Sequence, residues 1–387
     1  MQLALVLAVL LAPQATQAAQ APAASDARAV LEEKLRVGLE ELRSRNGLPA
    51  LGGAIVTADG VAAQAVVGVR SAESEAQAEV GDQWHLGSCT KAMTATLAAR
   101  LVEKGKASWD DTLEQVFPDL AEGMDPGWRG VTLRLLLSNR AGAPANLDAD
   151  GLWGRLWQHT GTPREQRLAL VEGVLLHPPE VAPGTKFLYS NAGFAIAGAM
   201  LETKLDEPWE DLIRREVFEP FGMTSAGFGA PGTPGKLDQP LGHRTTPQGQ
   251  RPVPLGKGDD NPAAIGPAGI VHASLEDWGR FAAAHLAGAA GKTDFLGADS
   301  WTRLHTAPEG QEYAMGWGLA PRPWAGGTAW THSGSNTMWF CTVWLAPEKG
   351  FGVLVTTNCA GPAATTACDE ACGVLIKAWS ETSGEKK

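Results

Sequence analysis

The spacing of apolar residues predicts a helix at each end of the chain. Residues 27–45 repeat apolar side chains every three or four positions, which places them on one helical face: Val30, Leu31, Leu35, Leu39 and Leu42. Asp26 fits the N-cap of this helix, and Gly47 fits the stop that follows its last turn. A final helix is predicted from about residue 362 to residue 379.

Strand-like runs also gather at the two ends of the chain. Near the start, residues 51–57 and 61–69 are apolar runs separated by Ala-Asp-Gly, and an Asp-Gly pair between such runs signals a hairpin. A short extended segment, residues 83–86, follows. Near the end, four runs bounded by turn residues read as strands: 313–319, 328–332, 337–345 and 350–358.

The middle of the chain reads as helical. The apolar spacing and the Pro and Gly positions predict helices at 88–104, 131–137, 151–160, 187–202, 208–221 and 274–286. In the first of these, Met93, Leu97 and Leu101 recur every four residues, which predicts a helix buried on one side. Residues 229–269 lose this periodicity and are rich in Pro and Gly, which indicates a long loop, either functional or simply solvated.

With strands at both ends and helices between them, the two ends are expected to meet in one sheet. The predicted fold class is α+β: a mostly antiparallel sheet flanked by the N- and C-terminal helices, with an inserted all-helical domain. The sheet domain takes residues 26–87 and about 290–387, and the helical domain takes residues 88–289. A junction of this kind is a natural place for a cleft.

The first residues have the character of a targeting segment. Residues 1–25 contain no charged side chain, and the apolar run at 3–11 is too short to cross a bilayer. Ala19-Gln20-Ala21 resembles a cleavage site, so residues 1–21 are predicted to be a signal peptide of a secreted or periplasmic protein. No Lys or Arg precedes the apolar run, so a disordered or buried alanine-rich leader is the alternative. No membrane span is expected in the mature chain.

Composition narrows the class of protein. The chain has 387 residues, 44% hydrophobic and 19% charged, which suits a globular protein with a sizeable core. A net charge of −11 argues against binding to nucleic acid or to anionic lipid. Five cysteines are too few for a disulfide framework, and no zinc-like spacing is present. Cys368 and Cys372 stand four apart in a predicted helix, where two ordinary thiols are favoured over a metal pair or a facing pair.

Residues 88–91 read Ser-Cys-Thr-Lys and carry the first candidate chemistry. A serine and a lysine three residues apart share one face of a helix. Ser88 becomes a nucleophile only if a base takes its proton, and Lys91 can be that base if burial lowers its pKa. Alone, the pattern is weak, because most such pairs lie on ordinary surface helices.

A second candidate is residues 189–191, Tyr-Ser-Asn, between a Pro-Gly turn and a helix. The chain has only two tyrosines, which reduces the chance of an accidental match. The phenol of Tyr189 can carry a proton between a serine oxygen and a leaving group, and the amide of Asn191 can hold the lysine and a substrate carbonyl. The alternative is a helix-capping turn with a buried tyrosine.

The third candidate is residues 332–335, His-Ser-Gly-Ser, between two strand-like runs. A glycine at position 334 would let a substrate lie along the backbone of an edge strand beside His332. The backbone N–H groups of Ser335 and Ser88 could then form an oxyanion hole. The alternative is a plain glycine-containing hairpin.

The three motifs, in this order, resemble those of the serine β-lactamase and penicillin-recognising family, and in particular its class C-related branch. Residues 183–185, 218–223 and 316–318 add smaller similarities, so the resemblance spans residues 30–380. It implies a β-lactamase/transpeptidase-like fold and an acyl-enzyme on Ser88, with no metal or organic cofactor. It also implies the residue roles: Lys91 with Tyr189 as base, Asn191, His332 and Gly334 as substrate-binding residues, and the N–H groups of Ser88 and Ser335 as oxyanion donors.

One departure from the family pattern affects the substrate. Many β-lactamases and DD-peptidases carry a lysine where this chain has His332, and histidine is mostly neutral at pH 7. Within the family, His-x-Gly is commoner among esterase-like and D-amino-acid peptidase-like members. We therefore expect a small-molecule or peptide-like ester or amide as substrate, with β-lactamase or DD-carboxypeptidase activity as the alternative. A non-catalytic binding protein on the same fold is a further alternative.

A second departure is smaller. Residues 138–142 read Ser-Asn-Arg-Ala-Gly, where relatives often read His-Thr-Ser-Gly, and this affects only the local loop. The cleft walls are expected to include residues 229–269. Trp153 and Trp157 are read as core or cleft-wall aromatics. The sequence leaves oligomeric state and cysteine pairing open.

Overall fold

The computed structural model describes residues 24–256 and 258–383. The predicted signal peptide, residues 1–21, lies outside the described residues. Within the part that is described, no helix is both long enough and apolar enough to cross a membrane.

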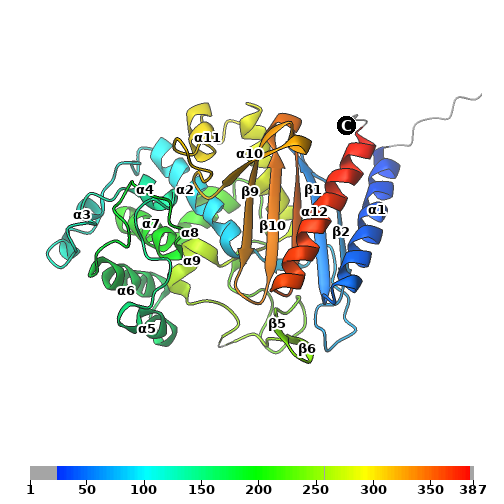
Figure 1. Ribbon diagram of the computed structural model, residues 1–387, viewed down its shortest axis with the longest axis horizontal. Helices are drawn as coiled ribbons and strands as arrows, with labels where there is room; N and C mark the ends of the chain where they lie inside the picture. Colours follow the sequence, from blue (N-terminus) through cyan, green and yellow to red (C-terminus); the bar gives the residue numbers. More distant parts are fainter. Residues whose placement is uncertain (1–23, 257, 384–387) are drawn as a thin grey trace, which may run out of the picture.

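Strands from the two ends of the chain lie side by side in one antiparallel sheet of six strands, in the order β2-β1-β11-β10-β9-β8 (Figure 1). Their bounds are β1 Ala50–Thr57, β2 Gly60–Gly68, β8 Gly318–Arg322, β9 Gly327–Ser335, β10 Phe340–Ala346 and β11 Phe351–Thr357. β1 pairs with β11 from Leu51↔Thr357 to Thr57↔Phe351. The meeting of the two chain ends is therefore confirmed, as is the α+β fold class.

The first and last helices pack together against the sheet, as predicted. α1 (Ala24–Arg45) contacts β2 and α12 (Pro362–Thr382), and α12 contacts β11 (Figure 1). Leu35 and Leu39 of α1 are fully buried in this layer, which is the outcome expected from their helical spacing. Another helix, α10 (Leu275–Ala289), packs against β1 and β2.

Helices make up most of the middle of the chain, as predicted. They are α2 Thr90–Glu103, α3 Leu113–Val116, α4 Leu133–Leu137, α5 Leu152–Gln158, α6 Pro163–Leu175, α7 Asn191–Leu205, α8 Trp209–Ile213, α9 Gly266–Gly269 and α11 Ala298–Leu304. Two small sheets accompany them, one of β3 Gln83–His85, β7 Val271–Ser274 and β4 Gly227–Phe228, the other of β5 His243–Thr246 and β6 Gly249–Pro252.

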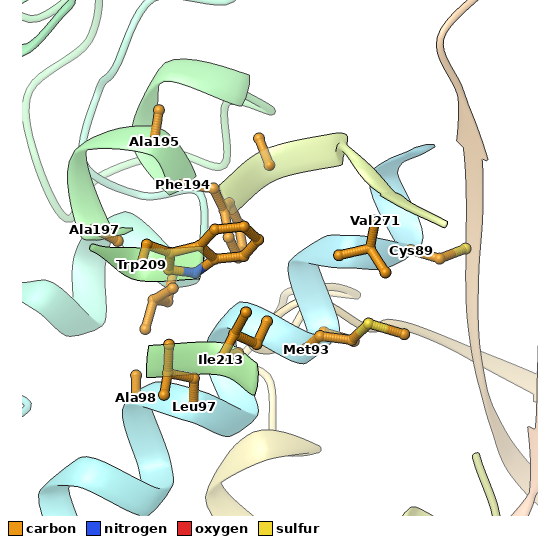
Figure 2. Close-up of a cluster of buried hydrophobic side chains, with 14 of the residues drawn as sticks. Cys89, Met93, Leu97, Ala98, Phe194, Ala195, Ala197, Trp209, Ile213 and Val271 are labelled. Atoms are coloured by element: carbon orange, nitrogen blue, oxygen red, sulfur yellow. The ribbon is translucent and has the colours of Figure 1, made fainter. Parts of the chain in front are cut away.

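The helix α2 is more deeply buried than its sequence indicated. Periodicity predicted burial on one side, but every residue from Thr90 to Ala99 is buried. The side chains between the large apolar residues are mostly alanine and threonine, which are small enough to let neighbours approach on all sides. Figure 2 shows Met93 and Leu97 of α2 within the cluster that also contains Trp209 and Ile213 of α8. The start of α2 is therefore held rigidly.

Several predicted boundaries are wrong, and two of the errors matter for the site. The helix expected from residue 187 begins only at Asn191, because the Ser190 hydroxyl caps it by accepting a hydrogen bond from the Gly193 N–H at 3.1 Å. The strand expected at 313–319 is instead a turn bridged between Tyr313 and Gly318, with β8 starting at Gly318. Both tyrosines of the chain thus lie in non-repetitive segments.

Two further predictions are wrong in part. The predicted helix at 208–221 is α8 followed by a π-helical turn, Arg214–Phe218. The predicted structureless loop at 229–269 contains the β5–β6 hairpin and ends in α9. Its many Pro and Gly residues hid these short elements from a periodicity argument.

Candidate active site

Ser88 and Lys91 lie at the point where an extended segment turns into α2. Ser88 sits in a short 3₁₀ turn, Gly87–Cys89, and Lys91 in the first turn of the helix that follows. The Ser88 side chain remains partly accessible to solvent, whereas Lys91 is 0% exposed. Lys91 Nζ lies 3.1 Å from Ser88 Oγ. The predicted pair is therefore in direct contact, with the hydroxyl toward solvent and the amine behind it.

The surroundings of Lys91 favour its uncharged form. Its Nζ donates to Asn191 Oδ1 at 2.7 Å and to the backbone oxygen of Ala268 at 2.9 Å, and both acceptors are neutral. Among the described residues, no carboxylate forms an ion pair with it. Burial lowers the pKa of Lys91 to about 7, with a small opposing effect from Cys89. A large fraction of Lys91 is thus neutral near pH 7 and can accept a proton from Ser88.

Tyr189 lies against the same pair. Its ring centroid is 4.7 Å from Lys91 Nζ. Burial raises the pKa of Tyr189 to about 12, although the neighbouring Ser88 side chain acts in the opposite direction. The phenol therefore keeps its proton at neutral pH, so of the two groups beside Ser88 the lysine is the better base and the tyrosine the better proton donor.

The segment that carries Tyr189 is held by Asn139, which sequence reasoning missed. The Leu188 N–H donates to the backbone oxygen of Asn139 at 2.8 Å, and the Ser190 N–H donates to its side-chain oxygen at 3.1 Å. Asn139 has a left-handed backbone with φ of 54°, a conformation that asparagine tolerates better than most residues. The sequence feature that could have pointed to Asn139 was its position in the loop at 138–142, where the chain departs from the family pattern.

The third motif lies in β9, directly against the turn that carries Ser88. A Cβ added to Gly87, whose φ is +47°, would stand 2.3 Å from the backbone nitrogen of Ser335. A Cβ added to Gly334 would stand 2.0 Å from the backbone oxygen of Leu86. Only glycine permits this approach at both positions. The backbones that carry the Ser88 and Ser335 N–H groups are therefore brought together.

His332 uses both ring nitrogens within the protein. Its Nδ1–H donates to the backbone oxygen of Ser333 at 2.7 Å, and its Nε2 accepts from the Tyr313 hydroxyl at 3.2 Å. Burial raises the pKa of Tyr313 well above its ordinary value, so this phenol keeps the proton it donates. These two hydrogen bonds need one ring proton only, which fits a neutral imidazole.

Tyr313 was not predicted as a site residue. Its ring meets those of Tyr189, His332 and Phe187, at centroid distances of 6.4, 5.9 and 5.2 Å. The signal that could have found it was the scarcity of tyrosine, since both tyrosines of the chain lie here.

The structure brings all seven predicted site residues together. It adds one residue from the 229–269 segment, Ala268, whose backbone oxygen accepts a hydrogen bond from Lys91.

The predicted aromatic residues of α5, Trp153 and Trp157, pack edge to face on each other with ring centroids 6.2 Å apart. Within the described residues, no group of three or more His, Cys, Asp or Glu side chains is arranged to hold a metal ion. All five cysteines are buried free thiols, including Cys368 and Cys372 of α12.

Comparison with known proteins agrees with this geometry. The β-lactamase family model matches residues 32–371. Penicillin-binding protein 4 of Amycolatopsis lactamdurans is 27% identical over 281 residues, which cover 70% of this chain and 71% of that protein. Lovastatin esterase of Penicillium rubens is 27% identical over 171 residues, 41% of this chain and 42% of the esterase.

A solved structure agrees with the fold. D-alanine carboxypeptidase AmpC from Burkholderia cenocepacia superposes with a TM-score of 0.70 at 20% identity, covering 90% of this chain and 99% of that one. Since the family model spans most of the chain, the protein belongs to the β-lactamase family and is a serine hydrolase of that type.

Proposed function

We propose that the protein hydrolyses an ester or amide through an acyl-enzyme on Ser88. The observation that carries this proposal is the contact between a partly exposed serine hydroxyl and a fully buried lysine with only neutral acceptors. A lysine in that setting can act as a general base near pH 7. A lysine kept only for stability would be expected to have a carboxylate partner.

The proposed reaction has two halves. Neutral Lys91 takes the hydroxyl proton while Ser88 Oγ attacks the substrate carbonyl, and the N–H groups of Ser88 and Ser335 stabilise the oxyanion. Tyr189 gives its proton to the departing alcohol or amine and is reprotonated from Lys91. A water molecule then loses a proton to the same pair, attacks the acyl carbonyl and releases the acid, with the proton returning to Ser88.

His332 supports an ester or amide rather than a β-lactam. A substrate carboxylate is bound best by a fixed positive charge, whereas both ring nitrogens of His332 are already hydrogen-bonded within the protein, to Ser333 and Tyr313. The relatives named penicillin-binding protein and D-alanine carboxypeptidase keep β-lactamase or DD-carboxypeptidase activity as the second candidate. A non-catalytic binding protein is the third.

The proposed site of action is outside the cytoplasm, in the periplasm or the medium. Support comes from the uncharged leader and its Ala19-Gln20-Ala21 cleavage-like sequence. Mass spectrometry of the N-terminus of the protein isolated from a bacterial host would test it: a mature chain starting at residue 20 or 22 is expected, and an intact Met1 in an exported fraction would contradict the cleavage.

The central experiment is labelling with a fluorophosphonate, followed by peptide mass spectrometry. We expect the label on Ser88 in the wild-type protein and none in Ser88→Ala, because the nucleophile is lost. A label on another residue, or none on a folded wild-type protein, would refute the acyl-serine proposal. Biological activity that survives in Ser88→Ala would favour a binding protein.

A substrate panel then ranks the two enzymatic candidates. We expect p-nitrophenyl esters to be turned over faster than nitrocefin. The opposite order, with cephalosporin hydrolysis far ahead, would favour the β-lactamase candidate.

A further inference from the structure

A largely enclosed carboxylate from the 229–269 segment joins the two backbones that meet at Ser88. Asp260 Oδ2 accepts a hydrogen bond from His85 Nε2 at 2.8 Å, and Asp260 Oδ1 accepts one from Asn336 Nδ2 at 3.0 Å. His85 precedes the Ser88 turn, and Asn336 directly follows Ser335. These two partners are 175 and 76 residues from Asp260 along the chain, so the carboxylate links three distant segments.

The protonation of His85 follows from its contacts. Its Nδ1 accepts a hydrogen bond from the Gly87 N–H at 3.1 Å, so the ring proton must lie on Nε2, which donates to Asp260. A continuous series of hydrogen bonds therefore runs from the Asp260 carboxylate through the imidazole to the backbone of Gly87, the residue before the nucleophile.

The arrangement is enclosed and well satisfied. His85 is 0% exposed, Asn336 is 2% exposed, and the Asp260 side chain is 10% exposed. Asp260 Oδ1 also accepts from the Asn261 N–H at 2.8 Å, so the carboxylate receives three hydrogen bonds. Among the described residues, no lysine or arginine forms an ion pair with it. Its negative charge is balanced by donors that belong to the two backbones it connects.

We propose that Asp260 is a positioning residue for the oxyanion hole, an inference that rests on the proposed acyl-Ser88 reaction. The two N–H groups of the hole belong to Ser88 and Ser335, each one residue away from a group that the Asp260 network holds. Through His85, Asp260 fixes the amide before Ser88, and through Asn336, it fixes the turn after Ser335. Oxyanion stabilisation depends on fixed donor positions, so the loss of this connection slows acylation more than it weakens substrate binding.

The inference also gives the 229–269 segment a role in the reaction. Near its end, the same segment includes Ala268, whose backbone oxygen accepts from Lys91 Nζ. Asp260 therefore reaches the residues of the oxyanion hole through His85 and Asn336, and Ala268 contacts the base directly.

The first test replaces Asp260 by Asn, with Asp238→Asn as the matched control. Asp238 lies in the same segment, and its carboxylate accepts from the exposed Thr233 N–H at 2.9 Å, without contact to the site. We expect Asp260→Asn to lower kcat for a p-nitrophenyl ester by about 10- to 100-fold with little change in KM, less than the loss caused by removing a donor outright. The control should match the wild type.

A second readout separates positioning from general stability. A thionoester places sulfur, a weaker hydrogen-bond acceptor, in the oxyanion hole, so the rate ratio of ester to thionoester reports on the donors. We expect this ratio to fall in Asp260→Asn and to stay unchanged in Asp238→Asn. An equal loss for both substrates, or a wild-type kcat in the folded variant, would overturn the inference.

Two substitutions of His85 show which half of the connection acts. Asn can place an oxygen near the position of Nδ1 and accept from Gly87, whereas Gln can place its amide N–H₂ near Nε2 and donate to Asp260. We expect neither variant to keep the wild-type ester-to-thionoester rate ratio, because each retains only one of the two hydrogen bonds, to Gly87 or to Asp260. A wild-type ratio in His85→Asn would show that Asp260 is not needed and would also overturn the inference.

If Asp260→Asn fails to fold, Asn336→Ala takes its place, with the same expected fall in ratio and the same overturning result. Fluorophosphonate labelling of the wild type keeps the two proposals apart. No label on Ser88 refutes the acyl-serine reaction itself. A normally labelled wild type with an unchanged ester-to-thionoester ratio in the variants refutes only the role of Asp260.

Discussion

One lysine and one arginine are fully buried within residues 24–256 and 258–383, and their surroundings differ in charge. Lys91 and Arg167 are each 0% exposed. Arg167 lies on α6 and forms paired hydrogen bonds with two carboxylates, to Glu202 at 2.6 and 3.0 Å and to Glu210 at 2.6 and 3.0 Å. The hydrogen-bond partners of Lys91 are a serine hydroxyl, an amide oxygen and a backbone oxygen, all of them neutral.

The difference appears in the pKa of each group. Burial alone lowers the pKa of a cation, and near Lys91 only the weaker effect of Cys89 opposes it, so the pKa of Lys91 falls to about 7. Burial acts on Arg167 as well, but the hydrogen bonds and charges of Glu202 and Glu210 outweigh it and raise its pKa above the ordinary value. A carboxylate partner thus makes a buried cation a fixed structural charge, and the lack of one makes it a proton acceptor.

The largest effect is expected when Lys91 is replaced by Ala. Removal of the general base should lower the acylation rate by about 100- to 10,000-fold, because Tyr189 keeps its proton at neutral pH and cannot accept another in place of Lys91. The measurement is the rate of fluorophosphonate labelling or of the first turnover of a p-nitrophenyl ester. Circular dichroism should show a folded protein. An unaltered acylation rate would assign the base to Tyr189 or to another group.

Replacement of Arg167 by Met should have the opposite profile. It leaves the carboxylates of Glu202 and Glu210 buried beside each other without their cation, so we expect the free energy of unfolding to fall by about 3–5 kcal/mol. Urea denaturation at neutral pH measures this loss. The kcat of the molecules that remain folded should stay near the wild-type value, since Arg167 contacts none of the site residues named above. A folded variant with a strongly reduced kcat would contradict the structural role.

The sequence was informative about the residues that face the substrate and poor on the residues that hold them in place. Ser88, Lys91, Tyr189 and Asn191 could be found because their spacing along the chain resembles a known pattern. The contacts of Asn139, Asp260 and Tyr313 join segments far apart in the chain, and no periodicity encodes them. The same is true of Arg167, whose charge in an amphipathic helix reads as surface.

The fold shows the same division. Apolar runs bounded by turn residues predicted the strands that the two chain ends contribute to the sheet, and helical periodicity predicted the helices that flank it. They failed at Tyr189, where side-chain hydrogen bonds to Ser190 and Gly193 set the local backbone, and at Tyr313, which lies in a turn closed by backbone hydrogen bonds. The Ser190 cap moved the start of α7 by several residues, and this shift is what leaves Tyr189 free to face Ser88.

A further expected effect is a dependence of the acylation rate on pH that follows the protonation of Lys91. Lys91 must be neutral to accept a proton, so the acylation rate should fall about tenfold per pH unit below about 7 and level off above it. Tyr189 loses its proton only near pH 12 and should not limit this plateau. Single-turnover rates between pH 5 and 9 measure the profile. Arg167 does not change its protonation between pH 5 and 9, so it does not set the midpoint of this profile. Arg167→Met should therefore keep the same midpoint.

The substitution Asn191→Asp sharpens the comparison by giving Lys91 the partner that Arg167 has. Asn191 Oδ1 lies 2.7 Å from Lys91 Nζ, so a carboxylate of nearly the same shape would favour the charged amine. We expect the midpoint of the acid limb to move up by about 1–3 pH units, with a slower rate at pH 7 and recovery at higher pH.

The same substitution should change how the free energy of unfolding depends on pH. In the wild type, Lys91 binds fewer protons folded than unfolded between its folded pKa of about 7 and its ordinary value of 10.5, so its contribution to the free energy of unfolding rises with pH across that window. In Asn191→Asp, the folded pKa of Lys91 should be higher, so the pH range over which the free energy of unfolding rises should begin at a higher pH. A midpoint that stays near 7 would show that the neutral surroundings of Lys91 do not set its proton affinity.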